Sequence, residues 1–415
     1  MTNRRAAIQI VERLREKGFL ALLAGGCVRD MLLGRRPKDY DVATDARPED
    51  VMVLFDRTLK VGAQFGVVIV LLRHAQVEVA TFRSEAGYQD GRHPDRVAFT
   101  DAASDAARRD FTINGMFYDP IEEQVIDYIG GQTDLQRRIV RTIGDADERF
   151  GEDYLRMLRA IRFSTQLDFA IEPETFAAIG RNARHITRIS GERIATELEA
   201  MLVHPNRGAG ASMLLASGLA EQIFPGLPVD RRGDACVALT SAVHTLQRLR
   251  KRVDFPLALA AFFCGCSAEA ALQMCHVLKL SRNQTRHLRF LLTHRGRLLD
   301  CEMALSSLKK LLAQPYYRDL YELERATQKA AGNKAALAAL AKLHRRVLSL
   351  RGVNVSPAPL LDGHDLIRLG ARPGPQVGQL AEELYIAQLE DCLHTRGQAE
   401  QWAKDWLAQH DLPGQ

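Results

Sequence analysis

The chain is 415 residues long, too long for one ordinary domain, and 46% of its residues are apolar, which is enough for several packed cores. It has no apolar run of the roughly eighteen residues that a membrane-spanning helix needs, and residues 1–16 are polar and charged, so we expect no signal peptide. A net charge of +5 is too mild to indicate a partner by itself, and seven scattered cysteines indicate reduced thiols in the cytoplasm rather than disulfides or a zinc site.

Hydrophobic periodicity divides the chain into two parts. Residues 1–140 mix strand-like and helix-like patterns, whereas nearly every later segment has helical spacing and is rich in alanine, leucine and arginine. We therefore predict an α+β head followed by a long all-α arm. Prolines within residues 225–228 and 356–359 predict breaks between helical segments of this arm.

A strand, a glycine turn and a helix start follow one another near the beginning of the chain. Residues 19–24 predict a short buried strand, Gly25 and Gly26 a sharp turn, and residues 28–33 a helix. Backbone N–H groups at such a turn can bind phosphate, and Arg29 in the first helical turn would add a charged donor. This segment is therefore a candidate polyphosphate site.

Two aspartates follow about ten residues later, around a second short predicted strand. Because side chains alternate along a strand, Asp39 and Asp41 should point to the same face. Two adjacent carboxylates repel each other unless a cation lies between them. Mg²⁺ is a hard cation that takes oxygen ligands and keeps phosphate oxygens as partners, so we predict a magnesium site here.

These two motifs resemble a known family. Gly-Gly-x-Val-Arg-Asp-x-Leu-Leu-Gly-Arg at residues 25–35, followed by Asp-x-Asp, is similar to the signature of class II tRNA nucleotidyltransferases and their relatives, the bacterial poly(A) polymerases. The resemblance implies a polymerase-β-like nucleotidyltransferase head, triphosphate contacts from Gly25, Gly26 and Arg29, and two Mg²⁺ ions held by Asp39 and Asp41.

Glu78 is the acidic residue within an otherwise apolar strand predicted at residues 77–82. It is either a solvated edge residue or a third metal ligand. The resemblance favours a ligand, because the family keeps a glutamate before a Thr-x-Arg such as residues 81–83. The turn-rich residues 84–95 are either a surface loop or, as in similar enzymes, a loop that adjusts the pocket between nucleotides.

Arg-Arg-Asp-Phe-Thr-x-Asn at residues 108–114 is similar to the second signature of the same family. We predict a helix here, which would place Asp110 and Asn114 on one face. A carboxylate beside an amide can recognise a ribose hydroxyl and reject a deoxynucleotide. Arg109 would bind the triphosphate. The alternative is an ordinary amphipathic helix.

Residues 152–163 predict a helix on which Asp153, Arg156 and Arg159 step by three beside a buried apolar stripe. Cytosine and adenine both present an amino donor beside a ring-nitrogen acceptor, whereas guanine and uracil present the reverse. Asp153, an acceptor, and Arg156, a donor, could therefore select C and A without a template; solvated ion pairs are the alternative. The resemblance implies this base-reading role and further nucleotide contacts from Arg159 and Arg162.

The resemblance thins beyond about residue 205. Residues 189–202 are similar to the helix that braces the family's neck, and we interpret them as structural. Basic clusters at residues 248–252 and 282–297 are either solvated faces or contacts to tRNA phosphates. Residues 257–264 are not followed by His-Asp, so we predict no phosphohydrolase activity, and His364-Asp365 is interpreted as a helix cap.

The predicted division is a nucleotidyltransferase head at residues 1–140, a helical neck with the base-reading helix at 141–205, a helical body at 206–350 and a tRNA-contacting tail at 351–415. The resemblance implies template-independent addition or repair of the 3′-terminal CCA of tRNA with CTP and ATP, releasing pyrophosphate. A poly(A) polymerase, a CC-adding or A-adding half-enzyme, and an RNA-binding protein with an inactive head are the alternatives; Asp39, Asp41 and Glu78 disfavour the last.

Overall fold

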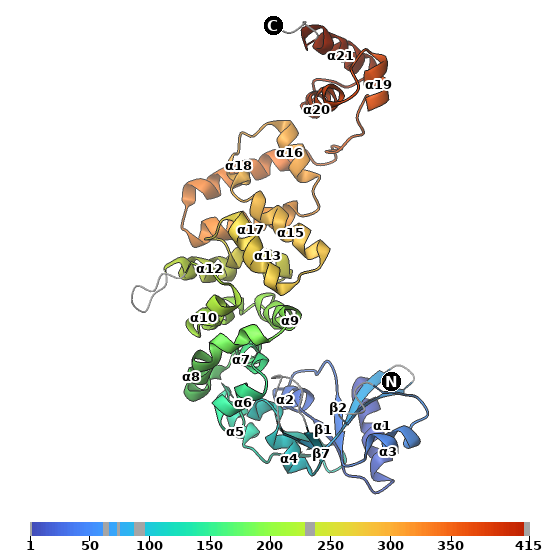
Figure 1. The fold of residues 1–415 in the computed structure, drawn as a ribbon, viewed down its shortest axis with the longest axis vertical. Helices are drawn as coiled ribbons and strands as arrows, with labels where there is room; N and C mark the ends of the chain where they lie inside the picture. Colours follow the sequence, from blue (N-terminus) through green and yellow to red (C-terminus); the bar gives the residue numbers. More distant parts are fainter. Residues whose placement is uncertain (1, 61–65, 73–74, 87–95, 229–236, 411–415) are drawn as a thin grey trace. The chain divides into compact units, whose positions relative to one another are not determined.

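The computed structural model describes residues 2–60, 66–72, 75–86, 96–228 and 237–410 (Figure 1). They form two compact units. The first unit comprises Met1–Val243 with Lys251–Phe255 and Glu269–Ser281, and the second comprises the remaining helical segments up to the end of the chain. Within the described residues, no helix is both long and apolar enough to cross a membrane.

A seven-stranded mixed sheet is the centre of the first unit, with strand order β3-β4-β5-β2-β1-β8-β9. Neighbouring strands are antiparallel except for β2 and β5, which are parallel. The strands are β1 (Ala21–Ala24), β2 (Asp41–Thr44), β3 (Thr58–Leu59), β4 (Val67–Leu72), β5 (Ala75–Thr81), β8 (Phe117–Asp119) and β9 (Gln124–Ile126).

The register of β2 explains where the acidic residues lie. Asp41 pairs with Ala24 at the end of β1, and Val42 pairs with Val79 of the parallel strand β5. The residues that precede this second pair, Asp41 and Glu78, therefore occupy neighbouring positions on adjacent strands. The sheet thus brings residues separated by 37 positions to one edge of a common surface.

Helix α1 (Asn3–Arg15) covers one face of the sheet with a buried apolar stripe that includes Ile10 and Leu14, and packs on β1, β2 and β5. The other elements of the α+β part surround the sheet. They are α2 (Gly26–Leu32), α3 (Pro48–Leu54), β6 (Arg83–Ala86), β7 (Arg96–Phe99), α4 (Ala102–Ala107), the 3-10 turn η2 (Thr112–Asn114), α5 (Gly131–Arg137) and β10 (Ile139–Val140).

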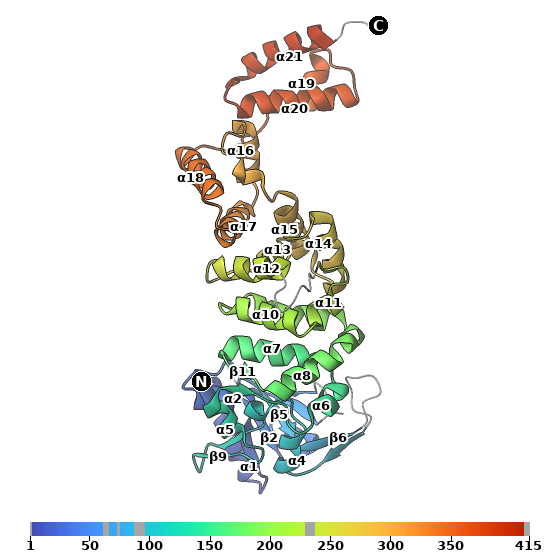
Figure 2. The same ribbon diagram turned by 90° about the vertical axis from the view of Figure 1, so that its left-hand side faces the viewer.

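The helical part of the first unit begins with α6 (Ala146–Glu152) and α7 (Leu155–Leu167). Helix α7 packs on α9 and α10, and Figure 2 shows α7 and α10 as successive layers. Leu158 and Ile161 are buried in this packing, as the apolar stripe predicts. The elements that follow along the chain are β11 (Ala170–Ile171), α8 (Pro173–Asn182), η3 (Ala183–Arg188), α9 (Gly191–Leu202), α10 (Arg207–Ala216), α11 (Leu219–Ile223) and α12 (Val237–Arg248).

The later chain is wholly helical in its described residues. Its elements are α13 (Phe255–Phe262), α14 (Ala268–Cys275), η4 (His276–Leu278), α15 (Arg282–Thr293), η5 (Arg297–Leu299), α16 (Leu305–Leu312), α17 (Tyr317–Ala330), α18 (Lys334–Ser349), α19 (Gly363–Arg368), α20 (Pro375–Leu389) and α21 (Arg396–His410). Asp362 and Asp365 form a capping box at α19, which confirms the predicted cap. The α+β head and all-α arm are confirmed, and so are the breaks near residues 225–228 and 356–359; the finer division into neck, body and tail stays a prediction.

Two local predictions are wrong. Asp110 does not lie on a helix: Phe111 forms an isolated β-bridge with Thr142, and only the short turn η2 follows. Asp153 does not lie on the base-reading helix either, because it ends α6 and precedes α7. In both cases the backbone is fixed by neighbouring segments rather than by local periodicity.

Residues of both predicted RNA-contacting clusters have structural partners. In the first cluster, Arg250 forms an ion pair with Asp319 at 2.5 Å. Arg295, in the basic cluster at residues 282–297, donates to the backbone carbonyls of Phe263 and Cys264 at 3.0 Å each. It therefore holds the end of α13 against the segment after α15. Most of the loop at residues 84–95 lies outside the described residues.

Candidate active site

A cavity of about 800 Å³ opens between the sheet edge and helices α7 and α9 of the first unit. Every residue predicted to act on a nucleotide lines it, although several were predicted from different motifs. These residues are Gly25, Gly26, Arg29, Asp39, Asp41, Glu78, Arg109, Asp110, Asn114, Asp153, Arg156, Arg159 and Arg162. The cavity therefore has an acidic side at the sheet and a basic side formed largely by α7.

The acidic side consists of Asp39, Asp41 and Glu78, whose side chains open onto the cavity. Withdrawal from bulk water and the charge of Glu78 raise the pKa of Asp41 to about 6; Arg109 opposes the rise and Asp39 adds to it. Among the described residues, no basic side chain forms an ion pair with these three carboxylates. A divalent cation would relieve their repulsion, and their oxygen atoms are the ligands that such an ion prefers.

The glycine turn forms the floor beside the acids. Gly25 has φ +75° and precedes α2, so it adopts a backbone conformation that favours glycine. A Cβ atom at this position would lie 2.9 Å from Nη1 of Arg109. Glycine therefore lets a guanidinium group approach the turn closely, next to the backbone that a phosphate would contact.

A buried carboxylate orients Arg109. Nε and Nη2 of Arg109 donate to Oδ2 of Asp105 at 3.2 and 3.0 Å, and its guanidinium lies 5.1 Å above the Phe117 ring. Asp105 is 1% exposed and also pairs with Arg108 at 2.7 Å. Burial alone would raise the pKa of Asp105, but Arg109 and Arg108 outweigh it and hold that pKa below its usual range.

A hydrogen-bond network replaces the predicted helical face around Asp110 and Asn114. Asn114 Nδ2 donates to Asp110 Oδ1 at 3.1 Å, and Arg29 Nη1 donates to Asn114 Oδ1 at 2.7 Å. Arg159 donates to Asp110 Oδ2 from Nε at 2.9 Å and from Nη2 at 2.6 Å. Although burial favours the neutral acid, Arg159 and Asn114 lower the pKa of Asp110, which remains an ionised acceptor.

Asp153 and Arg156 lie at the start of α7. The Asp153 carboxylate accepts from the backbone N–H of Leu155 at 3.0 Å through Oδ1 and from Arg193 Nη2 at 2.7 Å through Oδ2. Arg156 donates to the backbone carbonyl of Arg149 at 2.9 Å and pairs with Glu152. An acceptor just before α7 and a donor in its first turn are therefore held on the same cavity wall.

Comparison with known proteins gives the family. The family model described as "Poly A polymerase head domain" matches residues 21–141, and the one described as "Probable RNA and SrmB- binding site of polymerase A" matches residues 168–230. Over these residues the chain is similar to the class II tRNA nucleotidyltransferase and poly(A) polymerase family. The expected resemblance is therefore confirmed.

Curated relatives from several bacteria are named CCA-adding enzymes. The chain is 42% identical over 222 residues to the CCA-adding enzyme of Lactobacillus johnsonii, which is 53% of this chain and 55% of the relative. It is 44% identical over 230 residues to the CCA-adding enzyme of Bacillus pumilus, which is 55% of this chain and 57% of the relative. The matched part thus spans about half the length of these relatives.

Solved structures match over nearly the whole chain. The crystal structure of the Bacillus stearothermophilus CCA-adding enzyme in complex with CTP has a TM-score of 0.79 and 28% identity, covering 99% of each chain. The Thermotoga maritima CCA-adding enzyme complexed with tRNA has a TM-score of 0.68 and 20% identity, covering 97% of this chain and 95% of the other, and this likeness shows the fold alone.

A nucleotidyltransferase head of the kind that matches residues 21–141 uses a divalent metal, and Asp39, Asp41 and Glu78 are suited to hold one. Two residues that sequence reasoning missed also belong to the site. Arg193 of α9 lines the cavity, and Glu197 pairs with Arg162 at 2.5 Å. Residues 189–202 were interpreted as structural, yet the four-residue spacing of Arg193 and Glu197 on an otherwise amphipathic helix was a signal that both share one face.

Proposed function

We propose that this protein adds or repairs the 3′-terminal CCA of tRNA without a template, using CTP and ATP and releasing pyrophosphate. The observation that carries the proposal is that one cavity holds a carboxylate cluster, a set of oriented arginines and the Asp153–Arg156 pair. The curated CCA-adding enzymes of similar sequence and the CTP complex of a structural neighbour support it.

Asp39, Asp41 and Glu78 are the residues we propose as ligands for two Mg²⁺ ions. Metal ions in such a site lower the pKa of an attacking hydroxyl and neutralise the leaving pyrophosphate. The protein supplies the negative oxygen atoms, and it fixes Asp41 and Glu78 on two adjacent strands, β2 and β5, with Asp39 two residues before the start of β2.

The triphosphate would lie against the glycine turn. Gly25, Gly26, Arg29 and Arg109 all line this part of the cavity. The N–H of Gly25 donates to the Met116 carbonyl at 3.1 Å, so we assign the backbone contact with phosphate to the N–H of Gly26. Asp105 and Asn114 hold the two arginines in place before a nucleotide arrives, so little side-chain entropy remains to be lost on binding.

The ribose would contact Asp110 and Asn114. A 2′-hydroxyl can donate to the ionised Asp110 and accept from Asn114, whereas a deoxyribose leaves both groups without that partner. Arg159 keeps Asp110 charged and in position. Arg162, held by Glu197, completes the basic wall near the nucleotide.

The base would be selected by Asp153 and Arg156. Asp153 accepts from the amino group of C or A, and Arg156 donates to the adjacent ring nitrogen. Guanine and uracil present a carbonyl acceptor where C and A present the amino group, and a ring N–H donor where C and A present the ring nitrogen. The carbonyl would therefore face the acceptor Asp153, and the N–H would face the donor Arg156. Selection by a protein surface needs no template strand.

The tRNA is the proposed partner of the helical arm. Duplex RNA is recognised mainly by shape and phosphate contacts, which suits the basic clusters at residues 248–252 and 282–297, Arg250 and Arg295 excepted. A reaction on cytoplasmic tRNA needs no membrane attachment. We therefore assign tRNA phosphate contacts to both clusters as part of this proposal.

The decisive experiment supplies a tRNA lacking its last three residues with each nucleotide separately and together. We expect CTP to add two residues, ATP to add one only after CC, and GTP and UTP to add none. Long A tracts without C addition would identify a poly(A) polymerase, and addition of C alone or A alone would identify a half-enzyme. Asp41→Asn serves as the inactive control.

A further inference from the structure

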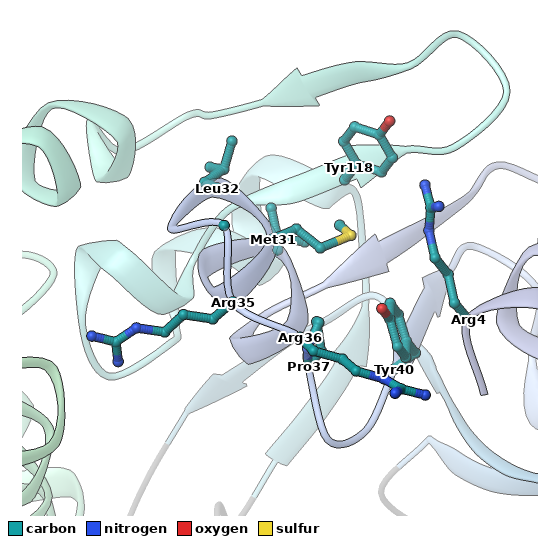
Figure 3. Close-up of a pocket in the computed structure, with 10 residues that line it drawn as sticks. Arg4, Met31, Leu32, Arg35, Arg36, Pro37, Tyr40 and Tyr118 are labelled. Carbon is teal, nitrogen blue, oxygen red and sulfur yellow. The ribbon is translucent and has the colours of Figure 1, made fainter. Parts of the chain in front are cut away.

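A second cavity, of about 500 Å³, lies in the α+β part behind the candidate active site. Its lining comes from α1, α2, the segment before β2 and strand β8. Figure 3 shows Tyr40 and Tyr118 on either side of the space beside Met31, with Arg4 at its edge. No part of the proposed reaction uses these residues.

The two cavities share a wall. Asp39 and Asp41 line the candidate active site, whereas Tyr40 between them lines the second cavity. Helix α2 is divided in the same way, because Arg29 faces the first cavity and Met31 the second. The separation follows from side-chain alternation along the strand and from the helical period.

The edge of the second cavity carries positive charge without counter-charge. Arg4 and Arg36 are exposed, and within the part of the chain that the structure describes no carboxylate forms an ion pair with either. Arg35 points away from the cavity in Figure 3 and donates to the backbone carbonyl of Gln166 at 3.4 Å. Two guanidinium groups, whose planar geometry suits phosphate, therefore lie at the edge of this cavity.

The floor of the cavity is aromatic and apolar and is built on fixed elements. Tyr40 is 8% exposed and Val28 is fully buried. Tyr118 lies on β8, where it pairs with Leu23 of β1. Asn3 Nδ2 donates to the Lys38 carbonyl at 3.4 Å, which ties the start of α1 to the segment before β2. The cavity is thus formed without a ligand.

We propose that this second cavity binds one nucleotide of single-stranded RNA, with its phosphate between Arg4 and Arg36 and its base against Tyr40 and Tyr118. Aromatic side chains beside a basic edge are the combination that recognises unpaired nucleotides, because every base has a π-face and every linkage carries a charge. The volume lies within the range of small-ligand sites. An acidic peptide would satisfy the arginines but would leave the tyrosine faces without a flat partner.

The test uses the full chain in EDTA, so that no metal-dependent reaction occurs and the result does not depend on the proposed function. Methionine methyl groups are labelled with ¹³C, and the Met31 signal is assigned with Met31→Leu. The probes are hexauridylate, UMP and inorganic phosphate. Uridine is chosen because the Asp153–Arg156 pair is mismatched to it.

We expect hexauridylate to shift the Met31 signal saturably, and the double variant Arg4→Ala/Arg36→Ala to weaken its Kd about tenfold or more through lost phosphate contacts. The matched control Arg5→Ala/Lys17→Ala removes the same charge elsewhere near α1 and should leave Kd within about twofold. Tyr118→Leu should weaken hexauridylate and leave phosphate binding unchanged.

Five results would overturn the proposal, and the first four leave no nucleotide site here. These four are an unshifted Met31 signal, equal weakening by the two double variants, inorganic phosphate binding as tightly as hexauridylate, and hexaglutamate binding more tightly than hexauridylate. The fifth, UMP binding as tightly as hexauridylate, would assign the cavity to free nucleotides and would contradict the assignment to RNA.

Discussion

Arg193 forms an ion pair with Asp153 in which Nη2 and Oδ2 are 2.7 Å apart. The two residues are separated by 40 positions and come from α9 and from the junction between α6 and α7. Since Asp153 lies outside the regular helix, this pair and the bond from the Leu155 N–H are what orient its carboxylate. The base selection that we propose for Asp153 would therefore depend on a residue that does not have to contact the base.

Replacing Arg193 should reduce nucleotide selectivity. In Arg193→Ala the Asp153 carboxylate loses one of its two partners, so we expect incorporation of C to fall about tenfold and the ratio of C to U incorporation to fall with it. The measurement is kcat/KM for each nucleotide with tRNA lacking the CCA end. Arg184→Ala, an exposed arginine of the nearby η3, is the control.

If Arg193→Ala lowered incorporation of every nucleotide equally, Arg193 would support the fold rather than position Asp153. If tRNA binding fell in parallel with activity, the assignment of α7 to base selection would also be wrong. Arg193→Lys should restore part of the selectivity, because it keeps the charge but not the fixed geometry of the guanidinium group.

Because the pKa of Asp41 is raised, we expect the stability of the protein to depend on pH and on bound metal. Its pKa in the folded protein is about 6 against an ordinary value of 3.8, so the folded state binds more protons than the unfolded state between these values. The free energy of unfolding therefore falls as the pH rises from about 4 to 6, and the full loss caused by ionised Asp41 is present above pH 6. Because the side chain is exposed to the cavity, the penalty is reduced by solvent to about 1 kcal/mol.

Asp41→Asn removes this penalty. In EDTA at pH 8 we expect its Tm to exceed that of the wild type by a few degrees, while its nucleotidyl transfer falls by about a thousandfold or more. Adding Mg²⁺ should raise the Tm of the wild type and of the exposed control Asp45→Asn but not that of Asp41→Asn. Equal Mg²⁺ responses in all three proteins would show that Asp41 is not a ligand.

The sequence predicted the parts of the site that local patterns encode. The strand before Gly25, the strand containing Glu78 and helix α3 after Arg47 lie where alternation, turn residues and the helix-starting Pro48 place them. Alternation also placed Asp39 and Asp41 on one cavity, since this rule holds for any short extended segment.

Contacts between distant segments were beyond local reasoning. Asp110 and Asn114 are four residues apart, and the helical interpretation put them together, but the bridge between Phe111 and Thr142 decides the backbone there. Likewise no periodicity shows that Arg193 meets Asp153. Such pairs depend on how α9 packs on α7, and that packing is fixed by the apolar faces of both helices.

Neutralising Asp105 should affect nucleotide binding through Arg109. Its pKa is held below the usual range, so the charged form contributes stability above the ordinary pKa and loses it as the pH falls through the lowered value. Asp105→Asn removes the charge that Arg108 and Arg109 share, and we expect the free energy of unfolding to fall by about 3 kcal/mol at pH 7. KM for CTP and ATP should rise while kcat changes less, because Arg109 remains but is no longer oriented.

Thermal unfolding and steady-state kinetics test this expectation together, with the exposed Glu122→Gln as the control. A fall in kcat at unchanged KM would place Arg109 in transition-state stabilisation rather than in nucleotide binding. Asp105→Glu should recover part of the affinity, since it keeps the charge at a slightly different distance.

We expect Asn114 to make the protein prefer ribonucleotides over deoxyribonucleotides. Its amide oxygen accepts from Arg29 and its nitrogen donates to Asp110, so Asn114→Ala removes a group that faces the proposed ribose and frees both neighbours. We expect the ratio of kcat/KM for CTP to that for dCTP to fall about tenfold. Asn182→Ala, at the end of α8, is the control. An equal loss for CTP and dCTP would make Asn114 a support for Arg29 alone.

Gly191, the first residue of α9, lies against the backbone of η4, the turn that follows α14. A Cβ atom there would lie 1.8 Å from the carbonyl oxygen of Val277 and 3.0 Å from its carbonyl carbon. These are backbone atoms, so they cannot rotate away as a side chain would. We expect Gly191→Ala to lower the free energy of unfolding by about 3 kcal/mol, by displacing the start of α9.

Gly180→Ala provides the matched control, because Gly180 is exposed within α8 and its added Cβ meets only the Ser217 carbonyl oxygen at 4.0 Å. Replacing a helical glycine in open space should raise stability by about 0.5–1 kcal/mol. Denaturant unfolding measures both. Since α9 carries Arg193, Gly191→Ala should also reduce the C to U selectivity at temperatures where it remains folded. A stable Gly191→Ala protein with unchanged selectivity would show that α9 can shift without moving Arg193, and the link from α9 packing to base selection would be wrong.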